Sequence, residues 1–326
     1  MSVDAAADSL GARTQAGMKI VVTGAAGLVG QNLIARLQQR GGHSIVAIDK
    51  HKANTKTLRD LHPDIEVIEA DMAEPGTWQQ SLRGADSIVI GHAQIGGLQR
   101  DEFTRNNLTA TERLLDAVAK NGGCHLVHLS SSVVKSAAID FYTESKKAQE
   151  ALVLASGNPV VVLRPTLMFG WFDRKHVGWL ARFMQRMPIF PIPGNGRYLR
   201  QPLYAGDLCQ IIMSCLDRRL SGGVHNISGQ HRIDYIDLMR IVRDAVQAST
   251  PIVKIPYGAF WLLLAAYALV DKNPPFTTQQ LRALVTPDVF EVIDWPSIFG
   301  VRATPLKDAL FETFRDPRYA TVSLEF

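Results

Sequence analysis

The sequence predicts an α/β protein built on a doubly wound parallel sheet, and two observations lead to this fold class. Segments typical of strands and of helices alternate between Lys19 and Leu163, as they do in chains that form parallel sheets. Several strand segments are continuous apolar runs, such as Val160-Val161-Val162-Leu163. Such runs are typical of strands that helices cover on both faces.

The elements follow one another in a regular order along this region. Strands are predicted at 19–23, 44–49, 65–70, 86–91, 124–130 and 159–164, and helices at 28–40, 75–83, 100–120 and 142–156. After Arg164-Pro165, prolines and glycines become frequent. There we expect a smaller and irregular region, with a short strand at 224–228 and helices at 234–247 and 258–270.

Composition excludes several classes of protein. The chain has 326 residues, and its net charge of +4 is spread over short clusters, so nucleic acid is not an expected partner. Its three cysteines are irregularly spaced, and no Cys/His spacing suggests a metal site. Residues 1–17 have no apolar core and do not read as a signal peptide. We expect a cytoplasmic protein.

The most apolar segment, residues 259–270, is 12 residues long. This length is too short to span a bilayer, so we expect no membrane span and a buried helix here. A helix on the membrane surface is the less favoured alternative, because the segment lacks a strongly basic polar face.

A glycine-rich turn follows the first predicted strand. The sequence Thr23-Gly24-Ala25-Ala26-Gly27-Leu28-Val29-Gly30 places glycines at i, i+3 and i+6 between this strand and the next helix. Glycines there permit a tight turn, a close approach of backbone N–H groups to phosphates, and close packing of helix on sheet. Asp49 ends the second strand, 19 residues after Gly30, where a carboxylate can bind ribose hydroxyls. We therefore expect a dinucleotide site.

A second group of polar residues lies later in the same region. Tyr142 and Lys146 are four residues apart, so they share one face of a helix. A free phenol has a pKa of about 10, and a neighbouring ammonium favours its ionised form. Ser130, Ser131 and Ser132 close the strand at 124–130, at the sheet edge where ligands bind. The pattern indicates a phenol that acts as acid and base.

With these residues the chain resembles the extended short-chain dehydrogenase/reductase superfamily, and within it the NAD-dependent sugar-nucleotide epimerase/dehydratase branch. The resemblance covers residues 19–309. It implies a Rossmann fold with NAD as cofactor and Tyr142 as the catalytic acid and base. Lys146 is implied to lower the pKa of that phenol and to hold the nicotinamide ribose. Ser131 is implied to orient the substrate oxygen, with Ser132 as the alternative position.

The resemblance also implies how the cofactor lies. Asp71, followed by Met72, matches the acid that contacts the adenine amine, and Gly91-His92-Ala93 matches the segment that lines the cofactor after the fourth strand. Asn107 matches a structural or catalytic asparagine. The cofactor-binding set is Gly24, Ala26, Gly27, Leu28, Val29, Gly30, Asp49, Asp71, Met72, Gly91, His92, Ala93, Asn107, Tyr142 and Lys146.

A later segment bears on the substrate. Residues 194–200 resemble the family's sugar-nucleotide segment, in which an arginine binds the substrate diphosphate. Arg200 matches this arginine, and Arg197 is a second candidate. His92 and Ser132 are further candidates for substrate contact. The family has an aspartate where this chain has Gln201.

The favoured function is thus an NAD-dependent epimerase that acts on a nucleotide-diphosphate sugar through transient hydride transfer. NAD is favoured over NADP because Asp49 repels a 2′-phosphate. Three alternatives stay open: a 4-keto-sugar reductase, a reductase or dehydrogenase of an apolar, steroid-like alcohol, and a protein that senses the cofactor without chemistry. Sensing proteins typically lack the tyrosine–lysine pair, so its presence argues against them.

These inferences divide the chain into three parts. They are a disordered extension at 1–17, an NAD-binding Rossmann domain at 18–165 and a mainly substrate-binding region at 166–326. The resemblance further implies a homodimer, in which the helices at 100–120 and 142–156 of two subunits form a four-helix bundle.

Overall fold

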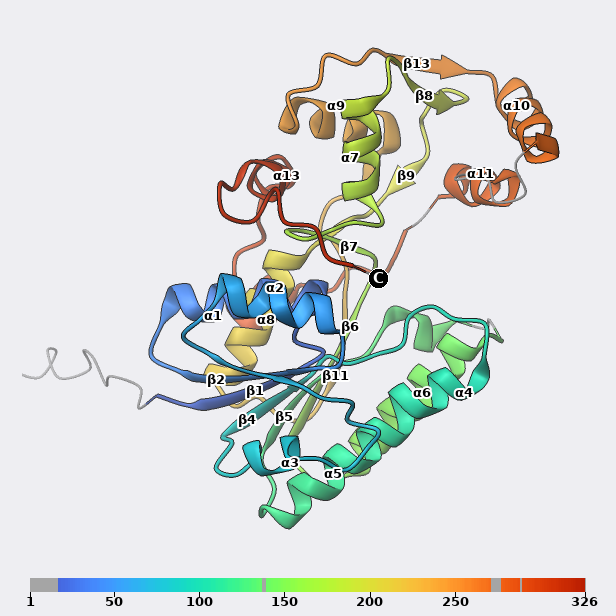
Figure 1. Ribbon diagram of the computed structural model, residues 1–326. Helices are drawn as coiled ribbons and strands as arrows, with labels where there is room; N and C mark the ends of the chain where they lie inside the picture. The colour runs from blue at the N-terminus through green and yellow to red at the C-terminus, as the bar shows by residue number, and fades with distance from the viewer. Residues whose placement is uncertain (1–16, 137–138, 271–276, 288, 326) are drawn as a thin grey trace, which may run out of the picture.

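A seven-stranded parallel sheet forms the centre of the protein (Figure 1). The computed structural model describes residues 17–136, 139–270, 277–287 and 289–325. The strand order is β11-β6-β5-β4-β1-β2-β3, and each neighbouring pair is parallel. The predicted fold class is confirmed. Apart from Gly17, the extension expected at 1–17 lies outside the described residues.

The strands of the sheet agree with the predicted ones to within two residues. They are β1 (Lys19–Thr23), β2 (Ser44–Asp49), β3 (Glu66–Glu69), β4 (Ser87–Ile90), β5 (His125–Leu129), β6 (Val160–Pro165) and β11 (Val224–Ile227). After β3 the chain crosses back to the other side of β1, so β1 and β4 lie side by side at the switch point. Ligands of open parallel sheets bind at such a point, beyond the carboxyl ends of the strands.

Helices cover both faces of the sheet. One layer holds α1 (Leu28–Arg40), α2 (Lys52–Leu61) and α8 (Ala205–Asp217), and the other holds α3 (Trp78–Ser81), α5 (Ala110–Lys120) and α6 (Phe141–Leu154). Alternate residues of β1 face opposite layers, since Ile20 packs with Leu33 and Leu208 while Val21 packs with Leu114. The division of the chain at residue 165 stays a prediction, but β11 and α8 show that the sheet and its cover draw on residues from both sides of it.

The helix expected at 100–120 is continuous, but its middle segment is π-helical. It consists of α4 (Arg100–Phe103), the π-helical segment η1 (Thr104–Thr109) and α5. A π-helical turn widens a helix locally and is frequent at functional sites. Here it contains Asn107, whose side chain is buried.

The region after residue 165 forms a second lobe above the sheet edge (Figure 1). Its core contains Met184, Phe190, Met239 and Leu310. Most of its helices and short strands were not predicted. The elements of this lobe are β7 (Met168–Phe169), α7 (Val177–Arg186), β8 (Phe190–Pro193), β9 (Leu199–Arg200), β10 (Leu203–Tyr204), β12 (Ile233–Asp234), α9 (Tyr235–Ala245), β13 (Ile252–Ile255), α10 (Tyr257–Val270), α11 (Thr278–Val285) and α13 (Leu306–Arg315). Helix α12 (Trp295–Phe299) instead packs against α8, in the core of the sheet.

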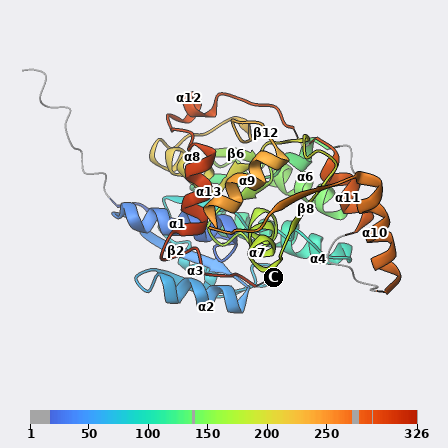
Figure 2. The same ribbon diagram turned by 90° about the horizontal axis from the view of Figure 1, so that it is seen from above.

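Helix α10 corrects one expectation. The apolar segment is helical as predicted, but the prediction that it is buried is wrong: Leu262, Leu263 and Leu269 are 64%, 61% and 88% exposed. Helix α10 packs against α11 at the rim of the lobe, where both views place it at the edge of the molecule (Figures 1 and 2). Within the described residues, we find no helix with the length and apolar character that a membrane crossing requires.

Candidate active site

The glycine turn brings the exits of β1 and β4 into direct contact. Gly24 has φ +65°, and a Cβ there would lie 2.6 Å from the carbonyl of Gly91 and from the amide nitrogen of His92. A Cβ on Gly30 would lie 2.5 Å from the carbonyl oxygens of Gly24 and Ala25. Side chains are therefore excluded from both positions. The first amides of α1 have no partner within the helix and are free to bind an anion.

Asp49 is fixed beside this turn. One carboxylate oxygen accepts the Ala26 amide and the other accepts the His51 amide, each at 2.9 Å. Asp49 and Gly27 line two adjoining cavities, of about 150 and 240 Å³. The first is also lined by the predicted residues Gly24, Asp71, Met72, Gly91, His92 and Ala93, and the second by Ala26 and Leu28. A main-chain cradle with a carboxylate at its end fits an adenine dinucleotide.

Asp71 is one of the residues that line the first cavity. It forms an ion pair with Arg105 at 2.5 Å and accepts the Ala73 amide at 3.0 Å. Burial alone raises the pKa of this carboxyl, but the Arg105 and Ala73 hydrogen bonds outweigh burial, and its pKa is lowered. Asp71 is therefore ionised and oriented by its neighbours.

Tyr142 lies in the first turn of α6, which Asp140 caps. The Asp140 carboxylate accepts the Thr143 amide and hydroxyl, both at 2.8 Å. Burial raises the pKa of Tyr142, and a hydrogen bond with the Ser131 side chain opposes that rise. Ser131 follows β5 and caps the short helix η2 (Ser132–Lys135), where its hydroxyl accepts the Val133 amide at 3.3 Å. The structure thus brings Ser131 and Tyr142 together.

Lys146 is buried on the same helix, one turn after Tyr142. Its ammonium donates to the carbonyl of Leu129 at 3.0 Å and to Gln149 Oε1 at 2.6 Å. Burial lowers its pKa to about 7, although the nearby charge of Glu150 raises it. Among the residues that the structure describes, Lys146 makes no hydrogen bond with Tyr142.

The Glu150 carboxylate is held by Arg164 of β6. Nε of Arg164 donates to one carboxylate oxygen at 3.0 Å, and Nη2 donates to the other. Burial raises the pKa of Glu150, but the hydrogen bonds and charge of Arg164 more than offset this effect and lower it. This bidentate pair fastens α6 to β6, the strand beside the one that leads to Ser131.

Hydrogen bonds continue from Lys146 to His92. Gln149 donates from Nε2 to the Thr111 hydroxyl at 3.0 Å, and that hydroxyl donates to the carbonyl of Asn107 at 2.6 Å. Thr111 then has no hydrogen left for His92 Nε2, which lies 2.9 Å away, so this geometry assigns the ring hydrogen to Nε2.

Both ring nitrogens of His92 are therefore engaged in hydrogen bonds within the protein. Its Nδ1 lies 2.9 Å from the Thr23 hydroxyl, and burial, with the charge of Lys146, lowers its pKa to about 3. Neither ring nitrogen points free to a ligand, although the residue lines the first cavity. The side chain of Asn107 is likewise engaged within the protein. It accepts a hydrogen bond from the Gln94 amide at 2.6 Å and donates one to the Ser145 hydroxyl at 2.9 Å.

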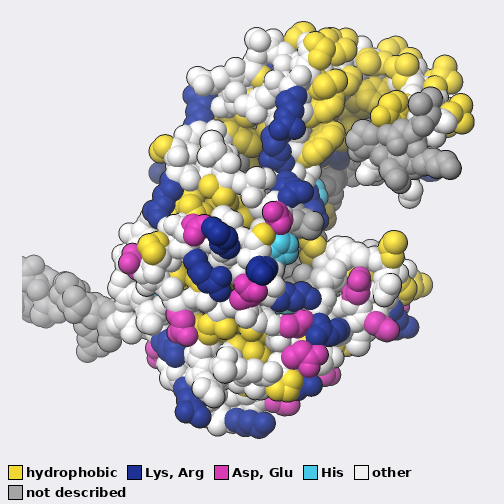
Figure 3. Space-filling model, viewed as in Figure 1, with side chains coloured by type: hydrophobic (Ala, Val, Ile, Leu, Met, Phe, Trp, Pro, Cys, Tyr) yellow, Lys and Arg dark blue, Asp and Glu magenta, His cyan; other side chains and the backbone are white. Residues whose placement is uncertain are grey.

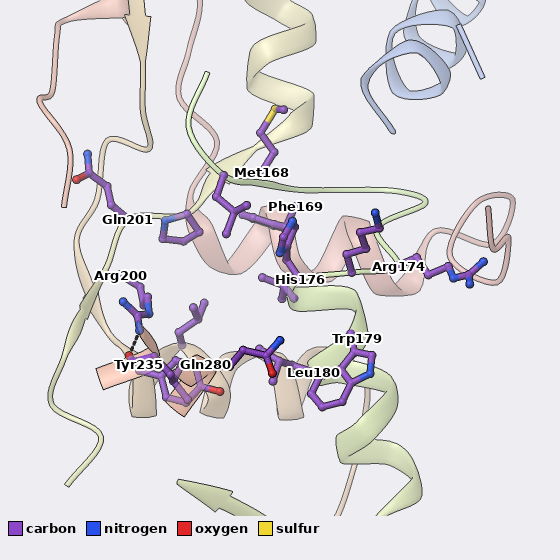
Figure 4. Close-up of a pocket in the computed structure, with 16 residues that line it drawn as sticks. Met168, Phe169, Arg174, His176, Trp179, Leu180, Arg200, Gln201, Tyr235 and Gln280 are labelled. Carbon is purple, nitrogen blue, oxygen red and sulfur yellow. Dashed lines mark hydrogen bonds between the residues drawn. The ribbon is translucent and has the colours of Figure 1, made fainter. Parts of the chain in front are cut away.

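A third and larger cavity, of about 560 Å³, lies between the sheet edge and the second lobe (Figure 4). It begins directly after β6 and shares Arg174, Lys175 and His176 with the second cavity, so the three cavities form one row. Most of its lining is apolar. The apolar members are Leu167, Met168, Phe169, Val177, Trp179, Leu180, Pro202, Leu238 and Leu284, and the polar ones are Arg174, Lys175, His176, Arg200, Gln201, Tyr235 and Gln280.

Arg200 lines this cavity, as shown in Figure 4, but its guanidinium is already bonded. It donates to the carbonyls of Thr286, at 2.8 Å, and of Leu284, and its centre lies 5.9 Å from the ring of Tyr235. Arg197 lies elsewhere: it is exposed and pairs with Asp234 at 2.7 Å.

Gln201, the departure from the family pattern, is buried and structural. Its amide bonds Ser228, Gly229 and the backbone of Phe290. Ser132 is half-buried at the start of η2.

The C-terminal tail closes one side of the second cavity. Glu325 lines it, and the backbone of Glu325 pairs with the Asn54 side chain through two hydrogen bonds of 2.8 Å. Tyr319 packs on Trp171 with ring centroids 4.6 Å apart. The tail is thus fastened to α2 and to the segment after β7.

Sequence reasoning missed several residues of this site. Gln149 and Thr111 hold Lys146 and His92, and His176 lies between the second and third cavities. The signal for the first two is helical spacing, because Gln149 follows Lys146 by three residues and Thr111 follows Asn107 by four. For His176 no local signal exists.

Comparisons with known proteins agree with this geometry. A family model, the NAD dependent epimerase/dehydratase family, matches residues 20–228. Ceramide reductase of Caulobacter vibrioides is 24% identical over 273 residues, which cover 83% of this chain and 81% of that protein. dTDP-glucose 4,6-dehydratase of an Actinoplanes species is 24% identical over 266 residues, which cover 71% and 82%.

Solved structures show the same fold. UDP-glucuronic acid 4-epimerase from Bacillus cereus, in complex with NAD, superposes with a TM-score of 0.67 over 92% of this chain and 98% of that chain, at 20% identity. The matched region of the family model contains the glycine turn, Asp49, Ser131, Tyr142 and Lys146. The chain belongs to the NAD-dependent epimerase/dehydratase family and is an enzyme of the short-chain dehydrogenase/reductase type with NAD as its cofactor.

Proposed function

We propose that this enzyme interconverts an apolar secondary alcohol and its ketone. The observation that carries the proposal is the lining of the third cavity, in which nine of sixteen residues are apolar. Its volume of about 560 Å³ falls in the range of small-molecule sites, which bury ligand surface mainly against apolar side chains. The likeness to a ceramide reductase over 83% of the chain supports a lipid-like substrate.

Arg200 supports the same choice. A substrate diphosphate needs a guanidinium with free N–H groups facing it. The Arg200 guanidinium instead bonds two main-chain carbonyls and holds the end of α11 against the cavity. We assign it a structural role in forming the apolar wall.

The chemistry follows from the contacts of Tyr142. NAD, when bound, supplies the acceptor or donor of the hydride that leaves or reaches the substrate carbon. Tyr142 takes the hydroxyl proton in oxidation and returns it to the carbonyl oxygen in reduction. We assign to Ser131, whose side chain opposes the rise in the pKa of Tyr142, the orientation of that oxygen. Lys146 remains the proposed partner of the nicotinamide ribose. The turn Gly24–Gly30 is the proposed site of the pyrophosphate, and Asp49 is the proposed partner of the adenosine ribose.

The test measures NADH absorbance at 340 nm for oxidation and reduction, and chromatographic separation of the products for nucleotide sugars, because an epimerase or dehydratase regenerates NAD and leaves this absorbance unchanged. We expect turnover with NADH and long-chain ketones, or with NAD and 3β-hydroxysteroids, and none with UDP-glucose or dTDP-glucose. A protein that turns over only nucleotide sugars would contradict the proposal.

A second candidate is the nucleotide-sugar epimerase. One observation favours it: Arg174, Lys175 and Arg200 all line the third cavity, and three cations suit a diphosphate. Melting curves with UDP, GDP and dTDP separate the two candidates. A rise in melting temperature that Arg200→Ala abolishes, and that Arg197→Ala leaves intact, would move this candidate to first place.

We also propose a homodimer through η1, α5 and α6. Leu114 and Val118 are buried in the subunit's own core and half-buried Leu115 packs against it, whereas Leu108 is half-buried and is left for a partner. Light scattering at micromolar concentration tests this assembly, and a monomer would contradict it.

A further inference from the structure

Helix α10 combines the composition of a core helix with an exposed position. It contains no charged residue, and every residue from Tyr257 to Leu269 is exposed or half-buried. Trp261 is 46% exposed, and Leu262 and Leu263 beside it are more so. A helix that is apolar on all sides normally lies in a protein core or in a membrane. Large exposed apolar patches of this kind mark interaction sites.

The length of α10 defines how a membrane can receive it. Fourteen residues extend about 21 Å, whereas the hydrocarbon core of a bilayer is about 30 Å thick. The helix therefore fits a position in the plane of the interface. Tyr257, Trp261 and Tyr267 supply aromatic rings with polar edges, which prefer the headgroup level of a bilayer.

The charges around α10 favour an anionic lipid surface. The sequence has no Asp or Glu between Asp244 and Asp271. Lys254, just before the helix, and Arg282, on the adjacent α11, are exposed cations. Figure 3 shows apolar side chains gathered over the upper part of the molecule, with Lys and Arg side chains beside them. Two copies of this cationic face would repel each other, while anionic headgroups attract it.

The exposed helix is also continuous with the third cavity. Helix α11 packs against α10, and its residues Gln280 and Leu284 line that cavity. A bilayer that receives α10 therefore lies close to the cavity wall. The functional benefit of docking, access to a substrate in the bilayer, rests on the proposed apolar substrate. The binding of α10 to a bilayer does not depend on the identity of the substrate.

We propose that α10, with Lys254 and Arg282 at its border, docks this enzyme on the surface of an anionic bilayer, where the helix lies in the plane of the interface.

The first experiment is co-sedimentation of the full chain with vesicles of phosphatidylcholine, with and without phosphatidylglycerol, in the absence of NAD and substrate. We expect binding that is stronger to the vesicles with phosphatidylglycerol. Leu262→Glu/Leu263→Glu should weaken it at least about tenfold, because both side chains enter the interface. Lys254→Gln/Arg282→Gln should weaken only the binding that depends on phosphatidylglycerol.

The matched control is Leu98→Glu/Ile298→Glu, which adds the same two charges at positions that are 94% and 41% exposed and lie outside both α10 and the proposed subunit interface. Melting curves confirm that each variant folds. The control should bind vesicles like the unmodified protein. Equal losses in both double variants would overturn the proposal, since net charge alone would then explain binding.

A second measurement places α10 itself in the interface. Trp261 fluorescence should shift to shorter wavelength on vesicles containing phosphatidylglycerol, and Trp261→Phe should keep binding but lose this shift. Absence of vesicle binding overturns the proposal. The proposal is also overturned if the protein does not bind vesicles but self-associates, and Leu262→Glu/Leu263→Glu abolishes this self-association. In that case α10 would be a subunit interface. Failure here leaves the proposed reaction intact, because that reaction is judged by NADH absorbance.

Discussion

The proposed ligand cleft has an NAD end and a substrate end, and these two ends are built in different ways. At the NAD end the main chain sets the shape, because a Cβ on Gly24 or Gly30 would lie within 2.6 Å of backbone atoms. At the substrate end, side chains such as Phe169, Trp179 and Leu238 set it, and they come from three separate segments. A backbone shape that only glycine permits can be recognised in eight consecutive residues. A cavity walled by distant side chains is defined only when the chain has folded.

The largest effect is expected at Tyr142, the proposed acid and base. Tyr142→Phe keeps the ring but removes the ionisable oxygen, so turnover should fall at least ~10²-fold while NAD affinity stays within about twofold. Steady-state kinetics and NAD titration measure both. The control is Tyr319→Phe, since that buried hydroxyl has no hydrogen-bond partner among the described residues. Turnover near that of the unmodified enzyme would remove Tyr142 from the mechanism.

At the NAD end, a small steric change should be enough to lower NAD affinity. Gly30→Ala places a methyl group 2.5 Å from two carbonyl oxygens, so we expect NAD affinity to fall at least about tenfold. Gly258→Ala is the matched control, because a Cβ there meets open space. Isothermal titration with NAD measures the difference, and equal affinities would show that the turn tolerates a side chain.

The buried ammonium of Lys146 should make the stability of the protein depend on pH. Its pKa is about 7 in the folded protein and about 10.4 in an unfolded chain. Between these values the unfolded chain binds more protons, so the free energy of unfolding rises with pH, by roughly 1.5 kcal/mol from pH 7.0 to 8.5. This window lies above the titration of ordinary histidines and below that of tyrosines. Below pH 7 the penalty of the buried charge is complete.

Lys146→Met should lack this rise. Urea unfolding at both pH values measures the difference between the two proteins. If the variant keeps the same pH dependence, another group causes it, and Lys146 stays protonated throughout the window.

At the substrate end a single side chain should matter less. Trp179→Ala removes part of one wall, so we expect the KM of an apolar substrate to rise about fivefold with NAD affinity unchanged. Leu98→Ala is the control, since this leucine is 94% exposed and outside the cavity lining. A loss of NAD affinity in Trp179→Ala would show that the two ends are not independent.

The smallest effect is expected at Arg105. Its ion pair with Asp71 is largely exposed, and such pairs contribute about 0–1 kcal/mol. Arg105→Gln should change NAD affinity less than about threefold, measured by titration at low and high salt. A larger loss would mean that Arg105 orients Asp71 for the adenine.

The strands of the sheet and the helices α1, α5 and α6 were predictable because each depends on a local pattern, whereas α2 was missed. The roles of Ser131 and Tyr142 came from the resemblance to a family and stay predictions. Helix α8 was missed although Leu208, Ile211, Ile212 and Cys215 have helical spacing. The position of α10 could not be predicted, because apolar composition shows that a segment avoids water but not what covers it. The bonds of Arg200 to Leu284 and Thr286 join residues more than eighty positions apart, so no motif reveals them.

The course of the tail matters for anyone who handles this protein. Because the backbone of Glu325 is hydrogen-bonded to Asn54 and Glu325 lines the second cavity, a tag or fluorescent domain fused directly after Glu325 would start at the rim of the proposed NAD site. A fusion ahead of β1 joins the chain at the amino ends of the strands, on the side of the sheet opposite to the ligands. Immobilisation through the N-terminus should therefore leave the cofactor entrance open, whereas immobilisation through the C-terminus should obstruct it.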